Sequence, residues 1–283
     1  MSTIEPADTG RTPLDPRKLD KVVPSAAEAV ADVADGSSLA VGGFGLAGIP
    51  WFLIEAVLEQ GAKDLTVVSN NCGVDGAGLG LLLEHRRISL VIASYVGENK
   101  EFARQYLAGE VSVELTPQGT LAERLRAGGA GIGAFFTPTG VGTLVAEGGL
   151  PWRYAEDGSV AEASPPKEVR TFDGREMVLE EGIVTDVGLV RAAVADRHGN
   201  CVFHAAARNF NPAAAMSGRL TIVEAEKVVE AGEIDPASVH LPGVFVDRVV
   251  ELTPEQAARK QVEKRTTTPR PDSTRDDAGE RGA

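Results

Sequence analysis

The sequence predicts an α/β fold, with a single open, largely parallel sheet and flanking helices. Short runs of apolar, β-branched residues alternate with helical segments through the central part of the chain, which is typical of this fold class. Some of these runs are apolar throughout, like strands that are buried on both faces of a parallel sheet. The chain has 283 residues and no internal repeat or clean linker, so one domain of up to about 250 residues with tails accounts for its length.

The two ends of the chain differ in composition from the part between them. Residues 1–20 are polar and contain several prolines, and residues 254–283 are highly charged with almost no large apolar side chain. Such segments bury too little apolar surface to offset the entropy of ordering them. We therefore expect a flexible N-terminal tail, one domain over residues 21–253, and a disordered C-terminal tail.

The domain is expected to open with a helix, a strand and a second helix. Ser25 can cap a helix that runs through Ala34. A strand over residues 39–41 then leads into a glycine-rich loop. Pro50 suits the first position of the following helix, and Gly61 should end that helix.

Three more strands and one helix should complete the first half of the domain. The apolar runs that predict the strands lie at 65–69, 88–94 and 111–115. Thr120 and Glu123 have the spacing of a capping box, which predicts a helix through Ala127. A glycine-rich stretch over residues 128–133 follows it.

The second half should add an antiparallel excursion and the remaining strands. Two runs flank Asp173-Gly174, which predicts a β-hairpin over residues 167–181. Further strands are expected at 189–195, 202–204, 220–225 and 244–250.

The composition argues against several classes of function. A formal net charge of -13 argues against nucleic acid as a partner, although it leaves room for a local basic patch around the phosphates of a small ligand. No run approaches the ~18 apolar residues of a membrane span, and the acidic N-terminal stretch is unlike a targeting peptide. The two cysteines provide no disulfide framework and the four histidines show no metal-ligand spacing, so we expect no bound metal and a cytoplasmic location.

The loop over residues 41–50 is the first candidate binding element. Gly43, Gly45 and Gly48 match the spacing G-x-G-x-x-G, in which glycines let backbone amides approach a ligand at the start of a helix. A dinucleotide-binding Rossmann unit would also need an acidic residue at the end of the next strand, where this chain has Ser-Asn-Asn at 69–71. A tight packing turn without a ligand is the other alternative.

Several longer segments occur along the chain in an order known from one protein family. They are GGFGLAGIP (42–50), SNNCGVDGAGLG (69–80), SYVGEN (94–99), ELTPQGTLAERLRAGGAGIGAFFTPTGVGT (114–143) and AARNFNP (206–212). Over roughly residues 20–250 the chain resembles the family I coenzyme A transferases, and in particular the A (alpha) subunits of 3-oxoacid CoA-transferases. The resemblance implies an open α/β fold similar to that of the sugar-phosphate isomerases.

The resemblance also implies a reaction and a partner. In the family a glutamate attacks an acyl-CoA thioester, the released CoA thiolate converts the resulting anhydride into a glutamyl-CoA thioester, and a second carboxylate then takes up CoA by the reverse steps. That glutamate lies in a Ser-Glu-Asn-Gly motif on the other half of the enzyme. We therefore expect an alpha subunit that is active only with its B (beta) counterpart, as a heterodimer or heterotetramer, with acyl-CoA as substrate and no permanently bound cofactor.

The resemblance assigns catalytic roles to three amide side chains and a binding role to the glycine loop. Gln118 would donate to the oxygen that gains charge during attack on the thioester, and Asn70 and Asn71 would orient the reacting groups. The alternative for Gln118 is a loop glutamine that hydrogen-bonds to local backbone, and the alternative for Asn70 and Asn71 is turn chemistry. The residues expected to bind CoA are Gly42, Gly43, Phe44, Gly45, Leu46, Ala47 and Gly48.

Other residues of these segments are expected to be structural. Cys72 follows Asn71 but has no family partner that would activate a thiol. Glu98 and Glu147 are the rival in-chain nucleophiles, but neither has the flanking residues of the partner's motif. The segment Arg208-Asn209-Phe210-Asn211 is a family hallmark without evident chemistry, and it indicates a structural or interface element.

Transfer of CoA from succinyl-CoA to acetoacetate is the leading functional prediction. Transfer to 3-oxoadipate or to a short-chain fatty acid is an alternative within the same class. A noncatalytic CoA-binding or scaffold subunit is a second alternative, and a Rossmann dehydrogenase is a third.

Overall fold

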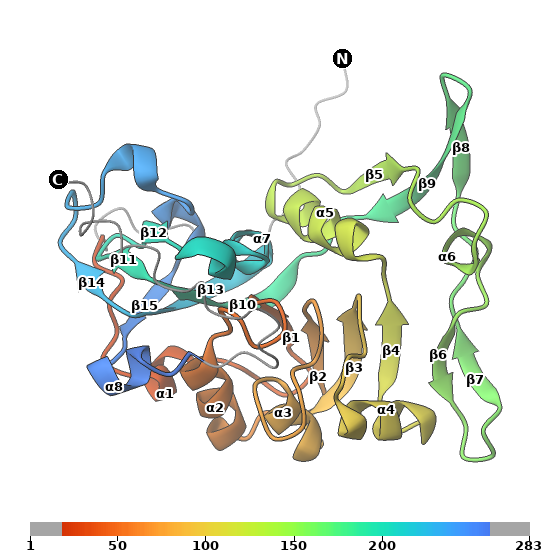
Figure 1. Ribbon diagram of the computed structural model, residues 1–283, viewed down its shortest axis with the longest axis horizontal. Helices are drawn as coiled ribbons and strands as arrows, with labels where there is room; N and C mark the ends of the chain where they lie inside the picture. The colour runs from red at the N-terminus through yellow and green to blue at the C-terminus, as the bar shows by residue number, and fades with distance from the viewer. Residues whose placement is uncertain (1–18, 261–283) are drawn as a thin grey trace, which may run out of the picture.

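The computed structural model describes residues 19–260, which are organised around a seven-stranded sheet (Figure 1). Its strands lie in the order β15-β13-β10-β1-β2-β3-β4, and every neighbouring pair is parallel. They are β1 Ser38–Val41, β2 Leu65–Val68, β3 Ile88–Ala93, β4 Ser112–Leu115, β10 Thr185–Ala192, β13 Gly218–Ala225 and β15 Arg248–Glu251. The predicted α/β fold with a largely parallel sheet is confirmed.

Helices cover both faces of this sheet. Successive residues of β1 point to opposite faces, so Leu39 and Val41 pack into one apolar core and Ala40 into the other. The first core is closed by α1 Ala26–Ala29, α2 Trp51–Gln60, α3 Gly80–Glu84 and α4 Lys100–Leu107. The second is closed by α5 Gln118–Gly129 and α7 Asn211–Ser217, on the opposite side of the sheet in Figure 1.

An antiparallel excursion between α5 and β10 lies beside the β4 edge of the sheet (Figure 1). The predicted hairpin is confirmed, and both residues of its turn, Asp173 and Gly174, have positive φ. The hydroxyl of Tyr106 donates to the carbonyl of Pro151 at 2.6 Å and ties the excursion to α4. Its elements are β5 Ala134–Thr137, α6 Leu144–Glu147, β6 Pro151–Tyr154, β7 Val160–Ala163, β8 Val169–Phe172 and β9 Arg175–Glu181.

Short elements connect and follow the last strands. The strand expected at 189–195 breaks at Ala193, and only two residues of the run near 202–204 pair as a strand. A 3₁₀ turn precedes β15, so that strand begins later than expected. The short elements are β11 Val194–Asp196, β12 Cys201–Val202, β14 Val228–Val229 and the 3₁₀ turns η1 Ala205–Arg208, η2 Pro236–Ser238 and η3 Gly243–Phe245.

Two predicted helix boundaries were wrong. Ser25 caps α1, but α1 ends at Ala29 because the following residues form tight i to i−3 bonds, including Val33 N–H to Val30 O at 3.0 Å. Helix α5 begins directly after Pro117, whose φ of -52° already suits a helix start.

The early start of α5 changes the roles of two residues. Thr120 lies inside the helix rather than at its cap, and its buried hydroxyl has no hydrogen-bond partner. Gln118 becomes the first helical residue, directly after the Thr116-Pro117 connection from β4.

The described part of the predicted C-terminal tail is ordered. Thr253 and Gln256 form a capping box for α8 Pro254–Ala257, which lies next to α1 in Figure 1. The remainder of the predicted tails, residues 1–18 and 261–283, lies outside the described residues. Among helices of the described part, none is long and apolar enough to cross a membrane.

A buried carboxylate fixes the start of α2. Glu224 on β13 is 0% exposed, and its Oε2 accepts hydrogen bonds from the backbone N–H groups of Phe52 and Leu53 at 2.9 and 3.0 Å. Its Oε1 lies 3.4 Å from Nη1 of Arg191 on β10. Burial nevertheless raises the pKa of Glu224 to about 7, against the opposing effect of these partners.

This pKa predicts a pH dependence of stability. In the unfolded chain the carboxyl releases its proton near pH 4.5, whereas in the folded chain it keeps the proton up to about pH 7. The stabilising contribution is therefore fully present below pH 4.5 and is lost as the pH rises through about 7. We expect the free energy of unfolding of the parent, measured in urea, to fall over this range relative to that of Glu224→Gln. Parallel pH profiles of the two proteins would contradict the assignment.

Candidate active site

The predicted catalytic and binding residues meet at one edge of the sheet. The glycine loop follows β1, Asn70 and Asn71 follow β2, Ser94 follows β3 and Gln118 follows β4. Ligands of open parallel sheets bind at this edge, outside the carboxyl ends of the strands. The edge therefore contains the whole set of residues that the sequence predicted.

Asn70 joins neighbouring parts of this edge. Its Oδ1 accepts from the backbone N–H of Gly45 at 3.4 Å, and its Nδ2 donates to Oγ of Ser94 at 3.0 Å. Asn71 is also buried, and its Oδ1 accepts from the N–H of Gly73 at 3.3 Å. Gln118 is exposed and two strands away from β2, a spacing of roughly 10 Å. The loop is thus hydrogen-bonded directly to Asn70, whereas Gln118 lies at the same edge of the sheet but farther from the loop.

The glycine loop is a tight backbone turn. Phe44 and Ala47 exchange both backbone hydrogen bonds at 3.0 Å, which closes a two-residue turn over Gly45 and Leu46. Gly45 has a φ of 57°, a conformation that side chains with a β carbon rarely adopt. The ring of Phe44 remains 44% exposed beside this turn.

Three of the loop glycines are required by packing within the chain. A β carbon on Gly42 would lie 2.0 Å from Oδ1 of Asn211, and one on Gly43 would lie 2.4 Å from Cγ2 of Ile49. A β carbon on Gly48 would lie 2.9 Å from that of Ala207. The packing interpretation of these glycines therefore has direct support, and binding of CoA to the loop stays a prediction.

The Arg-Asn-Phe-Asn segment holds the loop in place. Asn211 is fully buried, and its Nδ2 donates to the carbonyls of Gly48 and Ala207 at 2.9 and 2.8 Å. Its Oδ1 accepts from the backbone N–H of Arg191 at 3.1 Å. Asn209 donates to the carbonyl of Ala47 at 3.0 Å. Sequence reasoning expected a structural element here but missed that its partner is the loop, some 160 residues away.

The structure places the three in-chain rivals for the nucleophile in different settings. Cys72 is 0% exposed, and burial raises the pKa of its thiol, which opposes formation of a thiolate. Glu147 is exposed at the end of α6, in the antiparallel excursion. Glu98 is exposed on the loop after β3 and is the one rival at the site edge. Over residues 19–260 no cluster of His, Cys, Asp or Glu is suited to a metal ion.

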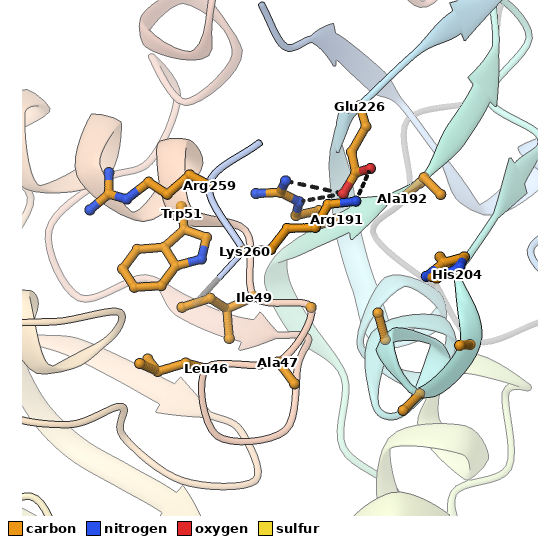
Figure 2. A pocket seen from close by; sticks show the side chains of 15 residues that line it. Leu46, Ala47, Ile49, Trp51, Arg191, Ala192, His204, Glu226, Arg259 and Lys260 are labelled. Atoms are coloured by element: carbon orange, nitrogen blue, oxygen red, sulfur yellow. Dashed lines mark hydrogen bonds and ion pairs between the residues drawn. The ribbon is translucent and has the colours of Figure 1, made fainter. Parts of the chain in front are cut away.

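A pocket of about 250 Å³ opens beside the glycine loop (Figure 2). It lies where β1 and β10 are neighbours, with the strands β2–β4 on one side and β13 and β15 on the other, which is the switch point of the sheet. Sequence reasoning missed it because its walls come from separate parts of the chain. The lining residues are Leu46, Ala47, Gly48, Ile49, Trp51, Arg191, Ala192, Ala193, His204, Ala205, Ala206, Ala207, Glu226, Arg259 and Lys260.

Comparison with known proteins agrees with the observed fold. The model of the coenzyme A transferase family matches residues 23–252, so the chain belongs to that family. The family resemblance predicted from the motifs is confirmed.

Individual relatives give more detail. The chain is 66% identical over 248 residues to a Mycobacterium tuberculosis protein named as the A subunit of a probable succinyl-CoA:3-ketoacid coenzyme A transferase, covering 88% of this chain and 99% of that protein. It is 50% identical over 251 residues to the human mitochondrial succinyl-CoA:3-ketoacid coenzyme A transferase 2, covering 89% of this chain and 48% of that protein. The Escherichia coli acyl-CoA transferase YdiF shares the fold, with a TM-score of 0.71 at 23% identity over 86% of this chain and 50% of that one.

Replacing Asn211 should remove the hydrogen bonds that hold the glycine loop to the Arg-Asn-Phe-Asn segment. In Asn211→Leu, the half-buried carbonyls of Gly48 and Ala207 and the N–H of Arg191 lose their partner, so we expect a loss of about 3 kcal/mol or more in the free energy of unfolding, measured in urea. Asn209→Ala is the matched control, because Asn209 holds one loop carbonyl from a half-buried position and should cost about 1 kcal/mol. Equal losses in the two variants would contradict a central role for Asn211.

Proposed function

We propose that the chain is the alpha subunit of a 3-oxoacid CoA-transferase that moves CoA from succinyl-CoA to a 3-oxoacid such as acetoacetate. The names of its relatives support these substrates, and so does the identity of 66% over almost the whole length of one relative. A cytoplasmic location and the absence of a permanently bound cofactor belong to the same proposal. The partner is a beta subunit that carries the nucleophilic glutamate.

The observation that carries this proposal is an incomplete active site. The edge of the sheet presents amides, which can bind and polarise a carbonyl, but the in-chain rival carboxylate at this edge, Glu98, lacks the flanking residues expected of the nucleophile. Glu147 lies in the excursion and Glu224 is sealed in the core, which leaves the exposed Glu98. The match to about half of the human relative fits this division, because the rest of that protein has the length of a second subunit.

The amides have distinct roles in the proposed chemistry. When the partner's glutamate attacks the thioester carbon, the carbonyl oxygen gains negative charge until the CoA thiolate leaves. A donor aimed at this oxygen stabilises the transition state more than the ground state. Gln118, exposed at the start of α5, can provide such a donor, and the positive end of the helix dipole adds to its effect. Asn70 and Asn71, anchored in the edge, orient the groups that react.

Catalysis should require the partner in trans. We expect the purified chain alone to exchange no CoA between succinyl-CoA and acetoacetate, and the reconstituted pair of subunits to do so. Borohydride reduction during turnover, followed by mass spectrometry, should mark a glutamate of the partner. Full activity of this chain alone, or a mark on Glu98, would overturn the two-subunit proposal. 3-Oxoadipate and short-chain fatty acids, assayed as competing acceptors, would identify the substrate.

Gln118→Ala in the assembled enzyme should test the oxyanion role. Loss of one oxyanion donor typically lowers kcat by about 10²- to 10³-fold, with a smaller change in KM. Gln60→Ala is a control that removes an amide far from this edge, near the C-terminal end of α2. A kcat of Gln118→Ala within about twofold of the parent would refute the role.

A further inference from the structure

The first turn of α5 carries the proposed oxyanion donor but has no cap of its own. Its N-cap residue is Pro117, which makes no side-chain hydrogen bond to the helix, and Gln118 follows directly. The first backbone N–H groups of a helix have no partner within the helix, so an uncapped first turn opens more readily than a capped one. The position of Gln118 therefore depends on contacts made from outside this turn.

The side chain of Arg124 makes such a contact from further along the same helix. Its Nη1 donates to Oε1 of Glu114 on β4 at 2.5 Å and to Oγ1 of Thr116 at 3.4 Å. The hydroxyl of Thr116 donates to the same oxygen of Glu114 at 3.3 Å. Arg124 thus reaches back to the connection between β4 and α5, at the residue that lies two positions before Gln118.

Arg124 is also anchored to the antiparallel excursion. Its Nε donates to the carbonyl of Glu181 at 2.9 Å, and its backbone carbonyl accepts from the N–H of Ile183 at 2.8 Å. Glu181 ends β9, which contacts α5 and lies beside it in Figure 1. The guanidinium therefore joins the end of β4, the start of α5 and the end of β9, which are separate parts of the chain.

This bridge is largely shielded from water. The side chains of Arg124 and Glu114 are 12% and 18% exposed, and that of Glu180, which lies 3.9 Å from Nε of Arg124, is 2% exposed. The pair between Arg126 and Glu123 on the same helix is different, because both side chains are about half exposed. Exposed pairs contribute little, whereas the loss of one partner from a shielded pair leaves a charge without compensation. The bridge of Arg124 can therefore fix backbone in a way that the pair of Arg126 cannot.

We propose that Arg124 is a positioning residue for the transfer reaction, which holds the connection from β4 so that the amide of Gln118 is aimed at the thioester oxygen. This inference rests on the proposed function, because it assigns Arg124 an effect that acts through Gln118. An oxyanion donor is effective when it is already in place as the charge develops. A displacement of about 1 Å, caused by a change away from the reacting atoms, can lower the rate by about 10²-fold.

A double-mutant cycle in the assembled enzyme tests the link between the two residues. Arg124→Gln should lower kcat by about 10- to 10²-fold with a smaller change in KM. Added to Gln118→Ala, it should lower kcat by less than a further factor of about two, because the donor that it positions is already absent. A general structural defect would instead lower kcat by the same factor in both backgrounds. Arg124→Lys should restore part of the loss, because it keeps the charge but lacks the forked donors.

Two further variants separate positioning from a defect in folding. Arg126→Gln removes the exposed pair on the same helix and should leave kcat within about twofold of the parent. Thr116→Val removes one hydroxyl from a buried side chain and keeps its shape, so it continues the test if Arg124→Gln does not fold. It should lower kcat by more than about twofold in the parent and by less than that in Gln118→Ala.

Hydrogen exchange in this chain alone gives a readout that does not involve catalysis. The N–H of Leu121 donates to the carbonyl of Pro117 at 2.8 Å and closes the first turn of α5. Arg124→Gln should speed exchange of this amide by about tenfold or more, measured by nuclear magnetic resonance, whereas Arg126→Gln should leave it unchanged.

The outcomes separate this inference from the proposed function. Unchanged exchange at Leu121, or equal factors in the two backgrounds of the cycle, would overturn the positioning role and leave the proposed function intact. An unchanged kcat in Arg124→Gln or in Thr116→Val would do the same. An assembled enzyme that transfers no CoA would contradict the proposed function, and faster exchange at Leu121 in Arg124→Gln would then still support the link between Arg124 and the first turn of α5.

Discussion

The side chain of Asn211 is the constraint on which the site depends. Its single amide satisfies two carbonyls, one in the glycine loop and one in the wall of the pocket, and it also receives a backbone N–H from β10. The absence of a β carbon on Gly42 creates the space in which this amide lies. A buried amide with these bonds is costly to disturb, so the loop, the strand and the pocket wall behave as one rigid body.

Glu224 and Arg191 extend this rigid body to the other end of the loop. The carboxylate caps the N–H groups at the start of α2, where the glycine loop ends, and the guanidinium ties β10 to β13 and to the carbonyl of Ala257. Hydrogen bonds therefore fix the glycine loop along its length and at the point where it joins α2. Such preorganisation is what a site needs if its amides are to act on a developing charge without first reorganising.

The rigid edge contrasts with the groups that remain free. The amide of Gln118 and the guanidinium of Arg208 are exposed and make no side-chain hydrogen bond or ion pair within residues 19–260, and the ring of Phe44 is 44% exposed. This distribution suits a half-site whose polarising groups stay in place while the reacting carboxylate arrives from a partner. The antiparallel excursion lies beside the β4 edge of the sheet (Figure 1).

The sequence by itself determined the fold class and the position along the chain of most strands of the main sheet, because apolar runs and glycine or proline boundaries act locally. It also determined which residues follow the carboxyl ends of β1, β2 and β4, so the candidate residues of the edge were predictable.

The start of α5 was misjudged because Thr120 and Glu123 match a capping box, whereas the helix already begins directly after Pro117. The tertiary structure decided what Asn211, Glu224 and the pocket do, because each joins segments far apart in the chain through buried polar contacts. No local pattern encodes such a contact, since a buried amide or carboxylate acquires its partners only when the sheet brings distant strands together.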